Sequence, residues 1–139
     1  MSNYDALWEY ADAPWASERS CPRQGKWLLF SSPEYHAAVW ETIKTATEAG
    51  TLGISAKTTS RTRPDYGVMR GVLTCVYTCN YDDLDDVRRV LVALRGLGFA
   101  RTLSYKTDED TLSGRYGKGV SIYVSPQGSR DFEDRRTTT

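Results

Sequence analysis

Residues 26–50, KWLLFSSPEYHAAVWETIKTATEAG, carry the clearest fold signal of this chain. The apolar run at 26–30 lies between a glycine and a serine-proline turn, which is typical of a central β-strand. Ser32 then provides a helix N-cap and Pro33 a first helical residue, and Gly50 provides the stop. This stretch therefore predicts a strand followed directly by a helix of about four turns.

The predicted helix has one apolar face. Val39, Trp40 and Ile43 fall on one stripe at helical spacing, so we expect that face to cover a sheet. His36 lies in the first turn and is the single histidine of the chain. Its ordinary pKa makes it the natural candidate for a general acid or base, and a packing role is the alternative.

Comparable patterns place further elements along the chain. Alternating or β-branched runs predict strands at 51–60, 71–79, 99–106 and 119–125, and an apolar stripe closed by two glycines predicts a second helix at 84–95. This order predicts an α+β domain with a mainly antiparallel sheet of about five or more strands and helices packed on one face. We expect this single domain to span residues 25–126, with an irregular aromatic segment at 1–24 and a flexible polar tail at 127–139.

Composition excludes several classes of protein. The chain has 139 residues, of which 40% are hydrophobic and 26% charged, so it fits one small soluble domain and not a disordered chain. Eighteen basic residues balance eighteen acidic ones, which argues against non-specific binding of duplex DNA. No apolar run suffices for a membrane span, and the first residues lack the pattern of a secretory signal. We therefore expect a cytoplasmic protein that does not bind membranes.

The cysteines fit neither a zinc site nor a disulfide framework. Cys21, Cys75 and Cys79 are an odd number, with one histidine to accompany them. Cys75 and Cys79 share a face of a predicted strand but lie too far apart along it to bridge. We expect reduced thiols, no metal and no cofactor.

The predicted outer face of the sheet is the candidate functional surface. Its expected members are Ser55, Lys57 and Thr59, then Thr102, Ser104 and Lys106, then Ser121, Tyr123 and Ser125, with Arg61, Arg63 and Arg115 in neighbouring loops. Several cations gathered in a chain of zero net charge are typical of a phosphate or carboxylate site. An ordinary solvated sheet face is the alternative.

Familiar enzyme motifs are absent from the sequence. It contains no Walker-type phosphate loop, no GxSxG elbow and no HExxH pair, which argues against an NTPase, a serine hydrolase and a zinc enzyme. The acids at 82–86 stand at a predicted helix N-terminus, where the helix dipole favours them without a bound cation.

Four segments together resemble the basophilic leukaemia-expressed protein family. These are GKWLLF, AGTLGISAKTTS, CVYTCNYDDLDDVRRVLVALRGLG and SYKTDEDTLSGRYGKGVSIYVSP, which lie within residues 25–126. The resemblance implies a fold similar to that of the cap-binding translation initiation factors, a curved antiparallel sheet backed by helices. Bacterial relatives in this family often carry a phosphothreonine lyase label.

That label implies a cofactor-independent elimination of phosphate from phosphothreonine or phosphoserine in a peptide or protein. The reaction needs a base, an acid and cations for the phosphate. Lys57 is the candidate base, and His36 or Tyr116 the candidate acid. Lys106, Arg115 and Tyr116 match the YK and GRY stretches of the family and would hold the phosphate.

Two other functions remain open. The same face could form a non-catalytic module for a nucleotide, an RNA end or a phosphopeptide. The candidate ligand contacts are Ser55, Arg61, Arg63, Tyr105, Arg115 and Tyr123, with Trp8, Tyr10 or Trp15 as stacking platforms. A cap-type sandwich could come only from Trp8 and Trp15, because Trp27 and Trp40 are predicted core residues. Alternatively, the aromatic segment at 1–24 could dock on a protein partner.

Overall fold

A computed structural model describes residues 7–107 and 121–137 of the chain. These residues form a seven-stranded sheet and two α-helices. The strands are β1 (Trp8–Asp12), β2 (Gly25–Ser31), β3 (Ser55–Thr59), β4 (Val72–Thr78), β5 (Leu103–Thr107), β6 (Tyr123–Ser125) and β7 (Glu133–Asp134). The helices are α1 (Pro33–Glu48) and α2 (Leu84–Gly96), with short 3₁₀ turns η1 (Ala16–Glu18), η2 (Tyr66–Val68) and η3 (Arg135–Thr137).

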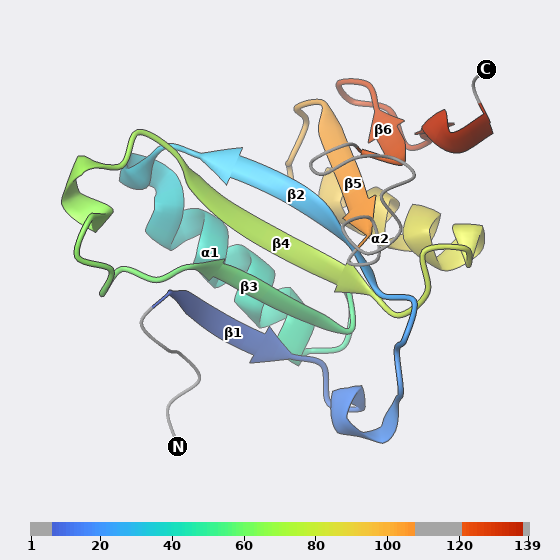
Figure 1. Ribbon diagram of the computed structural model, residues 1–139, viewed down its shortest axis with the longest axis horizontal. Helices are drawn as coiled ribbons and strands as arrows, with labels where there is room; N and C mark the ends of the chain where they lie inside the picture. The colour runs from blue at the N-terminus through green and yellow to red at the C-terminus, as the bar shows by residue number, and fades with distance from the viewer. Residues whose placement is uncertain (1–6, 108–120, 138–139) are drawn as a thin grey trace.

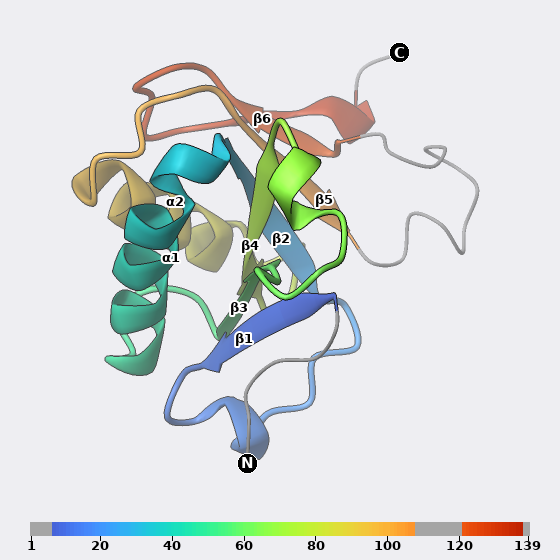
Figure 2. The same cartoon turned by 90° about the vertical axis from the view of Figure 1, so that its left-hand side faces the viewer.

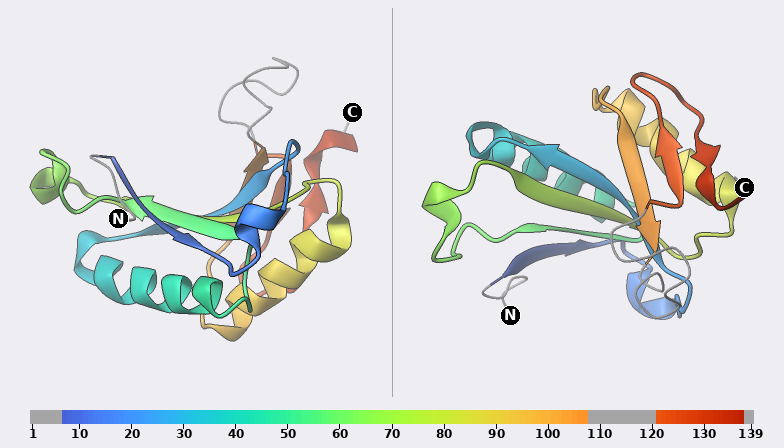
Figure 3. Two further views of the ribbon diagram at one scale, coloured as in Figure 1. Left: turned by 90° about the horizontal axis from the view of Figure 1, so that it is seen from below. Right: turned by 45° about the horizontal axis from the view of Figure 1, so that its top comes forward.

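The architecture is a two-layer α+β fold, as the sequence predicts. Every strand pairing is antiparallel, and the strand order is β1-β3-β4-β2-β5-β6-β7. Both α-helices cover one face of the sheet (Figures 1, 2 and 3). We call the other face the open face.

The main core lies between the helices and the sheet. Trp27 and Trp40 are fully buried there, which confirms their predicted role. The Trp27 indole N–H donates to the Val87 carbonyl at 3.1 Å, and that of Trp40 donates to a Glu9 carboxylate oxygen at 2.7 Å. Each ring therefore buries its apolar body while its one polar atom keeps a partner.

The register of β6 differs from the predicted one. Tyr123 and Ser125 were expected to face outward, but both are buried on the helix side. Tyr123 pairs with Tyr105 across the sheet, with ring centroids 5.1 Å apart, and its hydroxyl donates to the Tyr81 carbonyl. Alternation around Ile122 misled the prediction because Ile122 is buried just before the strand begins, and a one-residue slip reverses every side chain.

Both ends of the chain contribute more structure than the sequence indicates. The segment 1–24, expected to be irregular, contains the edge strand β1. The segment 127–139, expected to be a flexible tail, contains β7 and η3. Phe132 packs against Trp27 with ring centroids 5.9 Å apart. These segments are ordered by long-range contacts, which local periodicity does not reveal.

The expectation of reduced thiols is wrong for two of the three cysteines. Cys21 and Cys79 form a disulfide with Cα atoms 4.8 Å apart, whereas Cys75 is a buried thiol outside this bridge. The bridge closes a sequence separation of 58 residues. Spacing within β4 correctly excludes a bond between Cys75 and Cys79, but it carries no information about the distant segment that brings Cys21 alongside.

No helix within residues 7–107 and 121–137 has the length and apolar content that a membrane crossing requires.

Candidate functional site

Three lysines point from the open face of the sheet. Lys26 on β2 and Lys106 on β5 are direct partners across the strands. Lys57 on β3 lies in the neighbouring row, opposite Cys75. Side chains paired in this way share a face, and Lys26 alternates with the core residue Trp27. The three ammonium groups thus approach one surface from three different strands.

Aromatic rings lie among these lysines. The Lys57 Nζ atom is 4.0 Å from the centroid of the Trp8 ring and 5.9 Å from that of Tyr77. The Lys26 Nζ atom is 5.7 Å from the Tyr77 centroid. Tyr10 on β1 is the register partner of Lys57 and is exposed. We call Trp8, Tyr10, Lys26, Lys57, Tyr77 and Lys106 the lysine-aromatic cluster.

Two lysines opposite each other across a sheet repel one another. The Tyr77 ring, which lies near the ammonium groups of both Lys26 and Lys57, attracts these cations and offsets part of the repulsion on this face. Among the described strand residues, the acidic side chains on this face stand at its two edges, Asp12 on β1 and Glu133 on β7.

Between the lysines, Leu28, Cys75 and Tyr77 are buried on this face, and Ala16 and Cys21 pack against them. An anion would therefore bind at the lysine ammonium groups that rise around this small apolar cluster, with the Trp8 and Tyr10 rings beside it for a planar group.

Ser55 and Lys57 stand where the sequence predicts them. Both lie on the open-face side of β3, where Ser55 is the register partner of Tyr77. Ser104 and Lys106 likewise share the open-face side of β5. Because β3 and β5 keep regular alternation, their sequence patterns placed these hydroxyls and cations correctly.

The loop arginines stand apart from the lysine-aromatic cluster. Arg61 forms an ion pair with Glu9 at 3.6 Å, and Arg63 forms one with Asp65 at 3.1 Å. The loop that carries them joins β3 to β4 at the opposite end of the strands from Lys26 (Figure 1). These cations are therefore engaged in local ion pairs, at the end of the strands away from Lys26.

His36 lies on the opposite side of the sheet. It lies in the first turn of α1 and is 1% exposed, with Nδ1 2.6 Å from the Tyr66 hydroxyl and Nε2 2.8 Å from the Thr58 hydroxyl. Burial lowers the pKa of His36, Arg61 lowers it further, and Glu9 raises it. The neutral ring has one donor and one acceptor nitrogen, which matches its two hydroxyl partners. The structure thus favours the packing alternative for this histidine.

The remaining candidates are separated from the open face or lie outside the described residues. Tyr105 and Tyr123 are fully buried in the core. Burial, the largest cause, raises the Tyr123 pKa to about 12. Trp15 lies against Gly50, beyond the end of α1. Arg115 and Tyr116 fall in 108–120, outside the described residues.

Lys26 and Tyr77 join the site, although neither was predicted from the sequence. Lys26 begins the run KWLLF, where its alternation with Trp27 was the available signal. Tyr77 belongs to a strand that is apolar on both faces, so no pattern distinguishes its sides. Only the pairing of β2 with both β4 and β5 brings these two residues together with Lys106.

The described residues contain no group of three or more histidine, cysteine, aspartate or glutamate side chains that could hold a metal ion.

A search among curated proteins finds no match to this chain. The family model described as Basophilic leukemia-expressed protein Bles03 matches residues 14–111. The matched region contains the three open-face lysines together with β2, β3, β4, β5 and both α-helices. Because the match covers more than half of the sequence, the chain belongs to the basophilic leukemia-expressed protein Bles03 family.

Proposed function

We propose that the lysine-aromatic cluster binds a phosphate-bearing nucleotide, either free or at the end of an RNA. The observation that carries this proposal is the direct pairing of Lys26 with Lys106 beside Lys57, on the face opposite the helices. A bound phosphate would convert their mutual repulsion into attraction.

The rings distinguish a nucleotide from phosphate alone. Trp8 is half-buried and Tyr10 is exposed, and both lie on the open face. Tyr10 is the register partner of Lys57, and Trp8 is that of Thr59, two residues further along β3. A base stacked on such a ring gains about 1–3 kcal/mol. A nucleotide could therefore place its phosphate among the lysines and its base toward β1.

The arrangement supports binding more strongly than phosphate elimination. Lys57 and Lys106 share the open face and could hold a phosphate. The candidate acid His36 is separated from them by the sheet itself. Elimination needs an acid next to the leaving oxygen, and His36 does not meet that requirement. The other candidate acid, Tyr116, lies outside the described residues. The lyase reaction is accordingly the competing outcome in the test.

The test is a calorimetric titration with adenosine and guanosine monophosphate and with inorganic phosphate. We expect nucleotides to bind more tightly than phosphate, with an affinity that falls as salt rises. Lys57→Ala and Lys106→Ala should each weaken binding by about tenfold, which corresponds to ~1.4 kcal/mol. Lys44→Ala on α1 is the matched control, because that lysine lies in the helical layer.

The same preparation should be incubated with phosphothreonine and phosphoserine peptides and analysed by mass spectrometry. Loss of phosphoric acid from a peptide, abolished by Lys57→Ala, would support the lyase and reject the binding-only proposal. No nucleotide affinity, or equal affinity in all three lysine variants, would also reject it.

A further inference from the structure

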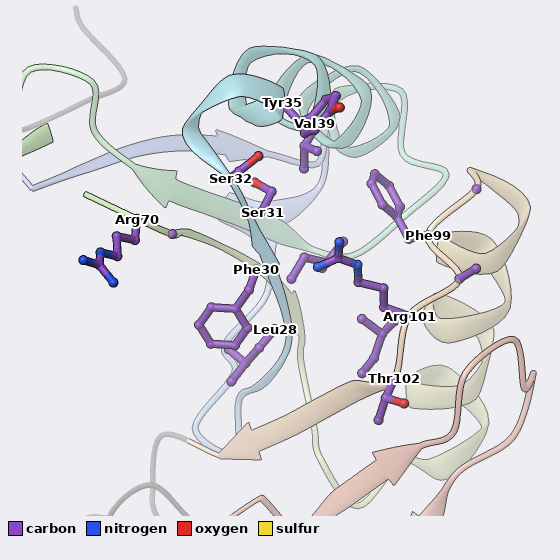
Figure 4. A pocket seen from close by; sticks show the side chains of 15 residues that line it. Leu28, Phe30, Ser31, Ser32, Tyr35, Val39, Arg70, Phe99, Arg101 and Thr102 are labelled. Carbon is purple, nitrogen blue, oxygen red and sulfur yellow. The ribbon is translucent and has the colours of Figure 1, made fainter. Parts of the chain in front are cut away.

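A cavity opens where β5 diverges from β2. It has a volume of about 690 Å³ and is lined by β2, the first turns of α1, and the segment between α2 and β5 (Figure 4). Neither the three open-face lysines nor the rings of the lysine-aromatic cluster line it. The cavity is therefore a feature separate from the proposed nucleotide site.

The cavity exposes part of the edge of β2. Pairing between β2 and β5 runs from Gly25 to Leu28, where Leu28 faces Ser104, whereas β2 continues to Ser31. Beyond Leu28, β2 is paired on the β4 side only. A strand edge with unpaired backbone groups is a template for another strand.

The orientation of the Phe30 backbone follows from its partner on β4. The Thr59 hydroxyl accepts a hydrogen bond from the Leu73 N–H at 3.0 Å and donates to the Leu73 carbonyl at 3.3 Å, so both groups point toward β3. Leu73 and Phe30 are register partners, and a pair of this kind turns its backbone groups outward on both strands. The Phe30 N–H and C=O consequently point to the side that β5 has left.

Apolar side chains surround this edge. Phe30 is 63% exposed and Tyr35 60% exposed, although both are large. Val39 and Phe99 are partly buried against the main core and form the inner lining. Exposed aromatic rings next to an apolar recess are typical of a protein-binding groove.

Two arginines flank the cavity. Arg70 and Arg101 are both exposed, both line the cavity, and neither forms an ion pair with a described residue (Figure 4). The Ser31 hydroxyl, also in the lining, is the one buried side-chain polar atom of the described residues that has no hydrogen-bond partner. The two exposed arginines thus offer positive charge to a ligand.

The wall opposite β2 is held by Arg95. Its guanidinium donates to the carbonyls of Phe99 at 2.8 Å and Arg101 at 2.6 Å, and to that of Ser129 at 2.7 Å. Charged donors of this kind fix a loop more firmly than neutral ones. The cavity is therefore built into the fold, which reduces the entropy lost when a ligand binds.

We propose that an extended acidic peptide binds this cavity as an added strand along Phe30. Its backbone would pair with the Phe30 N–H and C=O, an apolar side chain would enter the recess between Val39 and Phe99, and flanking carboxylates would meet Arg70 and Arg101. Main-chain pairing supplies affinity in this mode and the side chains supply selectivity.

The test is an NMR titration of the ¹⁵N-labelled protein with the peptide acetyl-Glu-Val-Leu-Val-Glu-amide. We expect the largest shifts at the amides of Phe30 and Arg101, and slower hydrogen exchange at Phe30. The lysine analogue, acetyl-Lys-Val-Leu-Val-Lys-amide, should bind at least tenfold more weakly. A peptide N-methylated at its central residue should also lose at least tenfold, because one backbone donor is removed.

Arg101→Glu should weaken binding of the acidic peptide at least tenfold, and it should reverse the preference between the two charged peptides. Arg19→Glu, an exposed arginine outside the cavity, is the matched control. Three outcomes would each overturn the proposal. The N-methylated peptide could bind as tightly as the parent peptide, the shifts could be confined to the lysine-aromatic cluster, or Phe30 could show no shift while the fold stays intact.

Discussion

The two ends of β2 differ in what they present. At its start, β2 is paired on both sides, and its outward side chain Lys26 joins a row of charge. At its end, β2 has lost β5, and Phe30 presents an aromatic ring and a bare backbone edge. One strand thus contributes to a charged surface at its start and to an apolar groove at its end. The difference arises because β5 diverges from β2, which leaves backbone groups at the end of β2 without a strand partner on that side.

Loss of the disulfide should have the largest effect, and it should act on the start of β2. Cys79 follows Thr78, the register partner of Gly25, and Cys21 precedes the strand. Reduction, or Cys21→Ser, should lower the free energy of unfolding by about 2–4 kcal/mol, because a loop of this size gains entropy when unfolded. Urea denaturation with and without reductant measures the difference.

Thiol counting provides the control. Alkylation of the denatured, non-reduced protein should modify Cys75 alone, since Cys21 and Cys79 are bonded. Three modified cysteines in protein purified under oxidising conditions would contradict the bridge. A protein held in a reducing cytoplasm, as the sequence analysis expects, would also give three.

Gly25→Ala should cause the next largest loss of stability. A Cβ at this position would run into the ring and hydroxyl of Tyr105 in the core. We expect a loss of about 1–3 kcal/mol from overpacking, together with weaker pairing between β2 and β5. Hydrogen exchange should then quicken at Lys26 and leave Phe30 nearly unchanged. Equal effects at both residues would show that the two ends are not independent.

Protonation of His36 should destabilise α1, the helix that forms one wall of the cavity. Burial lowers the pKa of His36 in the fold below its ordinary value of 6.5, so the unfolded chain binds this proton first as the pH falls. The stability due to the neutral ring is complete above about pH 6.5, and declines by about 1.4 kcal/mol per pH unit between the unfolded and folded pKa values. His36→Gln should remove this part of the pH dependence in urea titrations at pH 7.5 and 5.5. An unchanged slope in the variant would contradict the assignment.

Lys106→Gln should give the smallest change in stability, and this change should be an increase. Removing one of two facing lysines relieves repulsion, so the free protein should become more stable by about 0.2–1 kcal/mol. The same variant should bind nucleotides more weakly. A variant that loses both stability and affinity would show that Lys106 is held by favourable contacts and not by repulsion.

Sequence reasoning succeeded where local pattern and burial agree. The strand at 26–30, the helix from Pro33 and the buried Trp27 and Trp40 match the structure closely. Lys57 and Lys106 were placed on the correct face because β3 and β5 keep regular alternation. It failed for Tyr123, where a buried Ile122 just outside the strand imitates the alternation of a shifted register.

The candidate site was predicted only in part for a related reason. Arg61 and Arg63 are close to Lys57 in sequence, yet Arg61 pairs with Glu9 and Arg63 with Asp65, in a loop at the end of the strands opposite to Lys26. Lys26 is distant from Lys106 in sequence, yet the two are directly opposed. Proximity along the chain is therefore a poor guide to which cations meet in an antiparallel sheet.

The sequence by itself determined the elements, the apolar faces and the zero net charge, because these depend on residue type and on the periods of helix and strand. Tertiary structure alone decided the order of the strands, the partner of Cys21, the burial of His36 and the point where β5 leaves β2. These features arise from contacts between segments far apart in the chain, whose free energy depends on the packing of the whole domain and not on any local pattern.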